Sequence, residues 1–355
     1  MKIGLISDSH YGVRSDNVFF HDYFKKSVSQ FFIPELRKRG IKQIIHLGDL
    51  VDRRKYINYL TAKRLREDFL EPINAEFKMD IIAGNHDTFF KNTNSLNALT
   101  ELVQGAYQNI RIYTEPTEVL HDDMPILYVP WICSGNEEDT LEMIKETKAE
   151  ICFGHLELQG FEIQKGHIST HGLDKSYFSK FDVVCSGHYH HKSDYGSIHY
   201  LGAFCEHTWT DYGDPRGFHV YDTETRSIEF IQNPHTVFKK VRYDDEGKQI
   251  QTLLEMLDND PVTGKIVKII VRNKTNNYWF DLFVEKLESQ NPLEMQTVED
   301  HLNLYVENQE SIVENASDTL DMFKTYVKNL EFDPEKKNNV EKTIMSLYKE
   351  AMNIS

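Results

Sequence analysis

The fold is decided by a nine-residue stretch, IIHLGDLVD, at residues 44–52. Its apolar first half has the length and composition of a buried strand. The strand ends in a glycine that is followed directly by a carboxylate, Asp49. In sheets covered by helices, functional residues gather where strands end and loops turn outward. We therefore predict that Asp49 projects into a site at the end of a strand.

Four further segments combine a preceding strand-like run with metal-binding side chains. They are DSH (8–10), GNHD (84–87), GH (154–155) and GHYH (187–190). Glycine stands beside the polar residues in all but the first of these, as expected where a chain turns sharply. A single segment of this kind arises by chance often. Five in this order predict two divalent metal ions held at the ends of a buried sheet.

The residue types suit a pair of transition-metal ions. Two close cations need a shared anionic ligand to offset their repulsion, and Asp49 is the candidate bridge. Alternate residues of an extended segment point to the same side, which pairs Asp8 with His10 and His188 with His190. The mixture of imidazole, carboxylate and amide favours Mn²⁺, Fe²⁺ or Zn²⁺ over Ca²⁺ or Mg²⁺. The predicted ligands are Asp8, His10, Asp49, Asn85, His155, His188 and His190.

This ligand set makes a metal-dependent phosphoester hydrolase the leading interpretation. A pair of ions clamps a phosphate and lowers the pKa of a bridging water. The leaving oxygen needs a proton or a positive partner, and His86 is the candidate catalytic residue. We expect the carboxylate of Asp52 to hold its tautomer. Arg53 and Arg54 either contact substrate phosphate or belong to a solvated loop. Among the other histidines, His167, His171 and His207 are expected nearest to the cleft.

The bulk composition limits the partners. The chain has 355 residues and a formal net charge of −16. DNA affinity depends chiefly on phosphate neutralisation by clustered Lys and Arg, so this chain is not expected to hold nucleic acid alone. Bound metals and a partner would have to supply positive charge. There is no long uncharged apolar run, so no membrane span is expected. Four widely spaced cysteines indicate buried thiols in a reducing, cytoplasmic setting.

Strand-like and helix-like stretches alternate over about the first 235 residues, which predicts a sheet with helices on its faces. The first five are 2–7 (strand), 19–39 (helix, with Gly40 as its stop), 43–47 (strand), 60–73 (helix) and 79–83 (strand).

A second region begins after Asn233 and Pro234. Residues 236–298 show a strand–helix–strand–helix–strand pattern and predict a small α/β unit. The chain from 299 to 355 is acidic and helical in pattern, and Asp333 and Pro334 mark a helix start. The apolar face of that helix covers either its own domain or another protein.

The five-segment series resembles the calcineurin-like metallophosphoesterase superfamily across residues 1–235. Within it, the chain looks like the SbcD-type nuclease subunits of DNA double-strand-break repair complexes, most closely the recombination endonuclease subunits of T4-like bacteriophages. The stretches that carry this resemblance are GHLELQG (154–160), STHGL (169–173), SGHYH (186–190) and DPRGF (214–218).

The resemblance implies an α/β architecture, a metallophosphoesterase β-sandwich flanked by helices. Residues 1–235 would form the nuclease domain, 236–298 a small α/β DNA-capping domain, and 299–355 a helical C-terminal tail that binds an ATPase partner. It also implies a division of the ligands. One ion would take Asp8, His10, Asp49 and His190, and the other Asp49, Asn85, His155 and His188, with His86 as the catalytic histidine.

Members of that family are Mn²⁺-dependent nucleases of DNA recombination, repair and replication. They degrade double-stranded DNA as exonucleases and cut single-stranded DNA as endonucleases, beside an SMC-like ATPase of the SbcC type. The implied cofactors are two divalent ions, preferentially Mn²⁺, and the implied partners are DNA and the ATPase. The resemblance also implies a homodimer through helices near the first metal loops, 19–39 and 60–73. A phage-encoded chain would act in the host cytoplasm.

One departure motivates an alternative function. Many nuclease relatives have histidine at the position of Asp52, whereas GDLVDR (48–53) looks more like the loop of protein Ser/Thr phosphatases. There the second aspartate orients the catalytic histidine and the arginine holds phosphate. Arg54 replaces the glycine that completes that pattern. The alternative is therefore a phosphoprotein or small-phosphoester phosphatase. A non-catalytic scaffold is a third reading, against which the full ligand series argues.

Overall fold

The computed structural model describes residues 1–164 and 166–299. The chain divides into two compact units, which are described separately. Among the described residues, the first comprises Met1–His207 and Asp211–Phe238, and the second comprises Thr208–Thr210 and residues 239–299. The domain boundaries expected after 235 and 298 stay predictions. The tail expected over 299–355 lies outside the described residues, apart from residue 299.

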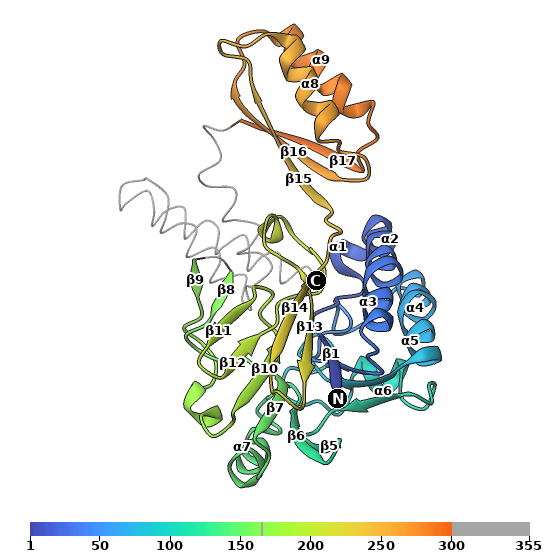
Figure 1. Cartoon of the computed structure of the whole chain (residues 1–355), viewed down its shortest axis with the longest axis vertical. Helices are drawn as coiled ribbons and strands as arrows, with labels where there is room; N and C mark the ends of the chain where they lie inside the picture. Colours follow the sequence, from blue (N-terminus) through green and yellow to red (C-terminus); the bar gives the residue numbers. More distant parts are fainter. Residues whose placement is uncertain (165, 300–355) are drawn as a thin grey trace, which may run out of the picture. The chain divides into compact units, whose positions relative to one another are not determined.

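Two six-stranded mixed sheets form the framework of the first unit, in the orders β14-β13-β1-β2-β3-β4 and β11-β12-β10-β7-β6-β5 (Figure 1). The first contains β1 (Lys2–Ile6), β2 (Gln43–His46), β3 (Lys78–Ile82), β4 (Ile110–Tyr113), β13 (Gly217–Asp222) and β14 (Ile228–Gln232). The second contains β5 (Thr117–His121), β6 (Met124–Val129), β7 (Ile151–His155), β10 (Val183–Gly187), β11 (Ser193–Tyr195) and β12 (Ile198–Tyr200). Strands β8 (Glu162–Gln164) and β9 (His167–Ile168) form a separate hairpin. The expected β-sandwich is confirmed.

The directions of the strands bring together the strand ends that the predicted ligands follow. β1, β2, β3 and β4 are parallel to one another, and so are β6, β7, β10 and β12. Parallel strands end at the same edge of their sheet, and loops that follow them gather there. Each sheet therefore delivers the residues that follow its central strands to one edge.

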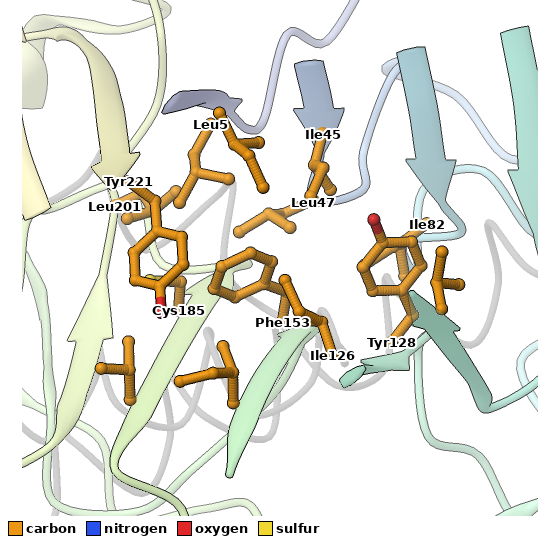
Figure 2. Packing of buried hydrophobic residues seen from close by; sticks show 14 residues of the cluster. Leu5, Ile45, Leu47, Ile82, Ile126, Tyr128, Phe153, Cys185, Leu201 and Tyr221 are labelled. Atoms are coloured by element: carbon orange, nitrogen blue, oxygen red, sulfur yellow. The ribbon is translucent and has the colours of Figure 1, made fainter. Parts of the chain in front are cut away.

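A buried apolar layer holds the two sheets face to face (Figure 2). Strands buried on both faces read as near-continuous apolar runs, as in residues 151–153 of β7. Burial of each large side chain contributes about 1.5–3 kcal/mol relative to exposure. The layer includes Leu5, Ile45, Leu47, Ile82, Ile126, Tyr128, Phe153, Cys185, Leu201 and Tyr221.

The two long predicted helices are present, each with a π-helical turn in the middle. The first consists of α2 (Val18–Ser27), η1 (Val28–Phe32) and α3 (Ile33–Lys38), and the second of α4 (Tyr59–Leu65), η2 (Arg66–Leu70) and α5 (Glu71–Glu76). Both π turns lie just before a proline, Pro34 or Pro72. Proline has no N–H for the regular helical bond, and a π turn shifts the bonding register at that point. Periodicity alone does not show this shift.

The remaining short elements of the first unit are α1 (Val13–Asp16), α6 (Ala98–Leu102), α7 (Glu137–Glu146) and η3 (Lys175–Phe178), with η4 (Trp209–Asp211) at the junction of the units. α1 is a left-handed turn, because Arg14 and Ser15 have φ of 56° and 60°. All four cysteines are free and buried. Across the described ranges, no helix combines the length and apolar character needed to cross a bilayer.

The second unit is a three-stranded sheet, β15 (Phe238–Asp244), β16 (Ile266–Asn273) and β17 (Glu294–Glu299), with helices α8 (Ile250–Asn259) and α9 (Asn277–Glu288). This order of elements matches the predicted small α/β unit. Its core lies between one sheet face and the helices and contains Tyr243, Leu253, Leu257, Val267, Ile269, Phe283 and Leu287.

A buried carboxylate ties several strands of the sandwich together. Asp80 on β3 is 1% exposed and accepts hydrogen bonds from Arg111 Nε at 2.8 Å and from the Tyr128 hydroxyl at 3.0 Å. The Tyr128 hydroxyl also lies 2.6 Å from His121 Nε2. Charge-assisted hydrogen bonds of this kind are about twice as strong as neutral ones. Asp80 therefore links the first sheet to β5 and β6 of the second.

Replacing Asp80 with asparagine should lower the stability of the first unit by about 2 kcal/mol, because a buried charge-assisted network loses its anion. Calorimetry in the presence of a chelator would show a lower Tm. Asp139→Asn, at an exposed position in the first turn of α7, is the control. An Asp80→Asn protein that melts with the wild type would contradict the role given to the network.

Candidate metal centre

All seven predicted ligand residues stand at the ends of strands in the first unit. Those of the first sheet follow β1 (Asp8, His10), β2 (Asp49) and β3 (Asn85), and those of the second end β7 (His155) or follow β10 (His188, His190). The donor atoms of six of them, together with those of His86, form three overlapping groups, within each of which all atoms lie within 4.8 Å of one another. The groups are Asp8–His10–His190, His10–Asp49–His86 and Asp49–His155–His188.

The first group has the spacing of ligands around one ion. His10 Nε2 and His190 Nε2 face each other at 3.0 Å. Asp8 Oδ1 is 3.9 Å from each of these nitrogens. Metal–ligand bonds of about 2.1 Å place neighbouring donors about 3 Å apart. Two facing imidazole nitrogens share at most one proton in the neutral state, so a cation satisfies the pair better than a hydrogen bond does.

Another set of donors, around His155 and His188, is centred on the amide oxygen of Asn85. This Oδ1 atom is 2.9 Å from His155 Nε2 and 2.9 Å from His188 Nδ1. Asp49 connects the two groups, because its Oδ2 atom is 3.3 Å from His155 Nε2 and 3.6 Å from His10 Nε2. The carboxylate predicted to bridge two ions thus lies between the two sets of donor atoms. The donor set fits a pair of transition-metal ions.

A main-chain contact prepares His155 for this role. Its Nδ1 lies 2.7 Å from the carbonyl oxygen of Leu47. A carbonyl can only accept, so Nδ1 carries the proton, and the lone pair of the neutral ring is at Nε2, on the side of Asn85 and Asp49. Hydrogen bonds that fix the tautomer of a ligand histidine in this way orient it toward its metal.

The electrostatics of the centre favour cations. Burial alone would lower the pKa of His10, but Asp52, Asp49 and Asp8 raise it to about 9. The same holds for His155. Burial lowers its pKa, but Asp49, Asp8 and the Leu47 carbonyl oxygen raise it to about 9. Burial raises the pKa of Asp49, but the neighbouring His155 and His86 outweigh it and leave that pKa well below its ordinary value. The centre therefore concentrates anionic charge away from water.

The backbone is strained at four of the predicted ligands. Asp8, His10, Asp49 and His188 have φ of 52°, 43°, 56° and 87°. Residues other than glycine rarely adopt positive φ, and such strain costs roughly 1–3 kcal/mol at each position and concentrates at functional sites. These conformations aim side chains that a relaxed loop would direct elsewhere.

Glycine is required at two positions beside the predicted ligands, for different reasons. Gly48 has φ of 93° and needs the left-handed region, as predicted for a sharp turn. Gly84 has no positive φ, and its requirement is space. A Cβ atom there would collide with the backbone nitrogen and carboxylate of Asp49. The absence of a side chain thus lets the loops after β2 and β3 approach each other.

Asp87 holds those two loops together, a role that sequence reasoning missed. Its buried carboxylate accepts hydrogen bonds from the backbone N–H groups of Asp49, Leu50 and Gly84 at 2.9, 2.9 and 2.8 Å, and from Val51 at 3.2 Å. The carboxylate therefore satisfies four backbone donors and fixes the turn that carries the candidate bridge. Its position within GNHD was the available signal.

His86 is held by the main chain of Asp52, not by its carboxylate. His86 Nδ1 lies 2.5 Å from the Asp52 carbonyl oxygen. The Asp52 carboxylate lies instead 3.4 Å from His10 Nδ1. This corrects the expected side-chain contact. The loop is placed by the Asp52 N–H, which donates to the Tyr11 carbonyl oxygen at 3.0 Å, and this turns the carbonyl toward His86.

The two arginines after Asp52 both bond to protein groups. Arg53 Nη1 donates to Asp16 Oδ2 at 2.8 Å, and Arg54 donates to the carbonyl and hydroxyl oxygens of Thr88 at 3.1 and 3.0 Å. Their expected contact with substrate phosphate stays a prediction. Of the three other histidines expected near the cleft, His167 and His171 are exposed, and His207 is buried beside His10 and His190.

Comparison with known proteins agrees with this geometry. The calcineurin-like phosphoesterase family matches residues 1–192. The chain belongs to that family. It is also 35% identical over 277 residues to exonuclease subunit 1 of Enterobacteria phage T4, covering 78% of each chain. The resemblance inferred from the motifs is confirmed, and the chain is an enzyme of the metal-dependent phosphoesterase class.

Solved structures add little. A novel archaeal phosphodiesterase has a TM-score of 0.32 and 17% identity, covering 65% of this chain and 99% of that one. A glutamine-dependent NAD⁺ synthetase from Acinetobacter baumannii, in complex with ADP, has a TM-score of 0.25 and 9% identity, covering 92% of this chain and 71% of that one. Scores this low carry no argument.

Replacing Asp87 with asparagine should weaken Mn²⁺ binding about 10- to 100-fold, the usual effect of losing a group that supports metal ligands. Asparagine has one acceptor oxygen and turns an NH₂ group toward backbone donors. Titration followed by the loss of the free Mn²⁺ electron paramagnetic resonance signal measures this affinity. Wild-type affinity in this variant would show that Asp87 does not position the centre.

Proposed function

We propose that the chain is a Mn²⁺-dependent DNA nuclease, the SbcD-type subunit of a recombination and repair complex, and that it hydrolyses phosphodiesters as a double-strand exonuclease and single-strand endonuclease. One observation carries the proposal: a relative named as an exonuclease subunit is 35% identical over 78% of each chain. The bridging position of Asp49 between two groups of ligand atoms supports two-metal catalysis.

In this proposal Asp8, His10, Asp49 and His190 hold one ion, and Asp49, Asn85, His155 and His188 hold the other. When bound, two such ions supply positive charge to a phosphoryl group and lower the pKa of a water molecule. Asp49 must remain ionised to serve both subsites, and its depressed pKa supports this.

His86 supplies the proton-handling group. Because the Asp52 carbonyl accepts from Nδ1–H, the other ring nitrogen, Nε2, is the one available to the leaving oxygen. His86 is half-buried and its ring centroid lies 4.8 Å from that of His10. It therefore stands beside the candidate metal centre with Nε2 not engaged by that carbonyl, and in the doubly protonated ring this nitrogen can give its proton to the leaving oxygen, as a general acid requires.

The phosphatase alternative rested on an Asp52 carboxylate orienting His86 and on an Arg53 available to phosphate. The contacts of these residues give no specific support to it. Asp52 reaches His86 through its carbonyl oxygen, and Arg53 is paired with Asp16. Phosphopeptide turnover with DNA left intact remains the result that would favour it.

DNA and a protein partner are proposed on grounds of charge. With a net charge of −16, the chain needs other sources of positive potential to hold a polyanion. In the second unit, Val241 and Tyr243 pack into the core under the helices, so alternation places Lys240 and Arg242 on the opposite sheet face. That face is the part of this unit that we propose to contact DNA. The SMC-like ATPase of the SbcC type is proposed to bind the 299–355 region, which the described residues do not reach.

The nuclease test uses linear duplex and single-stranded DNA with Mn²⁺ or Mg²⁺, with and without the ATPase and ATP. Nucleotide release is expected with Mn²⁺. His86→Ala should lower the rate by about 10²- to 10⁴-fold and leave Mn²⁺ affinity unchanged. His199→Ala is the matched control, because His199 Nδ1 is held by Asp194 at 2.6 Å and His199 is not a predicted ligand.

Two results of that test would count against the assignments. No release of nucleotides by the wild type with Mn²⁺, even beside the ATPase, would refute the nuclease proposal. Loss of Mn²⁺ binding in His86→Ala would show that this histidine is a ligand and not the catalytic acid.

We further propose a homodimer through the first turns of α2 and α4. These turns adjoin, because His21 Nε2 and the Thr61 hydroxyl are 3.1 Å apart. The surface around them exposes five apolar side chains. They are Val18 (46%), Phe19 (43%), Tyr56 (63%), Tyr59 (94%) and Leu60 (40%). A contiguous apolar surface next to a site is typical of a protein interface, and a two-fold dimer would pair this surface with its own copy.

Tyr59→Glu should convert the dimer to a monomer, because it places a charge in the proposed interface while costing little in folding at a 94% exposed position. Sedimentation velocity should give twice 41.6 kDa for the wild type and 41.6 kDa for the variant. Leu120→Glu, at a 69% exposed position on β5, is the control. A monomeric wild type would refute the dimer.

A further inference from the structure

His207 is a buried histidine whose ring has no hydrogen-bond partner in the described part of the chain. The residue is 1% exposed, and neither ring nitrogen has a hydrogen-bond partner among the described residues. Its backbone is fixed, because the His207 N–H donates to Asp211 Oδ2 at 2.6 Å. The side chain is therefore held in place with its polar atoms unsatisfied by protein.

The ring lies against the candidate first metal subsite. Its centroid is 5.1 Å from that of His10 and 5.2 Å from that of His190, both in edge-on arrangements. On another side it meets Phe24, at 5.7 Å. None of the three ligand groups found among the described residues includes His207. His207 thus adjoins the two imidazoles of this subsite without joining them as a ligand.

Packing alone does not account for a histidine here. The His207 ring is enclosed by protein, and neither of its nitrogens is hydrogen-bonded to a described residue. A neutral imidazole has one N–H donor and one acceptor. Burying both without hydrogen bonds is unfavourable. A leucine would fill the space against Phe24 without that cost. The ring nitrogens are therefore placed for a partner that the described residues do not supply.

A neighbouring group points to the same conclusion. Arg216 is 5% exposed and pairs through Nη2 with Asp211 and Asp214 at 2.5 and 3.1 Å. Its Nε and Nη1 atoms have no hydrogen-bond partner among the described residues. Adjacent buried polar atoms without protein partners are the usual setting of internal water, which makes about three hydrogen bonds.

We propose that His207 is a positioning residue of the first metal subsite, which hydrogen-bonds to a water molecule in the coordination shell of the ion held by Asp8, His10, Asp49 and His190. By fixing this water, His207 tightens the hold of the subsite on its ion. The inference rests on the metal centre proposed above. It explains why a histidine occupies a place where an apolar side chain would pack. It also gives a role to a residue that is not one of the seven predicted ligands.

The test compares His207→Leu with the wild type in two states. Without metal, in chelator, the Tm of the variant should equal or exceed that of the wild type, because an unsatisfied buried group is removed. With Mn²⁺, only one of the two proposed binding sites should be affected. The affinity of that site for Mn²⁺ should fall about 10- to 100-fold. His207→Gln keeps a donor and an acceptor and should restore part of that affinity.

A matched control is His219→Leu. His219 is 4% exposed and its Nδ1 also lacks a hydrogen-bond partner among the described residues, but it lies on β13 next to Phe230. Its replacement should leave Mn²⁺ affinity unchanged. Two Mn²⁺ sites of wild-type affinity in His207→Leu overturn the proposal. A wild type that binds no Mn²⁺ instead refutes the metal centre itself.

A second measurement does not depend on the folding of the leucine variant. In wild-type protein with ¹⁵N-labelled histidine, the His207 signals are those missing from His207→Gln. Addition of diamagnetic Zn²⁺ should shift a ring nitrogen of His207 and slow the solvent exchange of its ring proton. Ring signals that stay unchanged while the ligand histidines shift would overturn the proposal.

Discussion

The structure depends on the burial of two carboxylates, Asp8 and Asp49, at the point where the two sheets of the sandwich deliver their strand ends. Both side chains are removed from water, and an ionised carboxylate is unstable there without compensating charge. The imidazoles of His10 and His155 face them and have raised pKa values for that reason. Protons provide this compensation in the absence of metal, and divalent ions provide more of it. The chemistry of the centre follows from this arrangement of charge.

Holding that charge in place has a structural cost that the rest of the fold covers. Four predicted ligand residues have positive φ, and there is no room for a side chain at Gly84 against Asp49. The carboxylate of Asp87 offsets part of this by binding four backbone N–H groups of the two loops. The apolar layer between the sheets supplies the remaining stability, because it fixes the strands from which these loops start. A strained site is stable when the surrounding structure determines it so fully.

The sequence predicted the sandwich, the small α/β unit and the residues that converge, because these depend on local patterns: an apolar strand, a turn and a ligand. It did not predict contacts made through the backbone. The Asp52 carbonyl, and not the carboxylate, meets His86, and no side-chain pattern encodes the direction of a carbonyl. Asp87 was overlooked because its carboxylate faces inward to N–H groups. His207 was expected near the cleft, but it belongs to no motif, and its contact with His10, almost two hundred residues earlier in the chain, was not predicted.

The charge of the centre also bears on how an acidic protein meets DNA. Without metal, the protons on His10 and His155 offset the charges of Asp8 and Asp49, while the overall charge of −16 repels a phosphodiester. Two divalent ions held as proposed would bring four positive charges against these two carboxylates, and bound ions are then the largest local charges in the site. Metal loading would therefore make the local field positive. On this argument, metal is required for the phosphodiester to approach as well as for its hydrolysis, and a chain that relies on its metals in this way needs fewer arginines and lysines around the cleft.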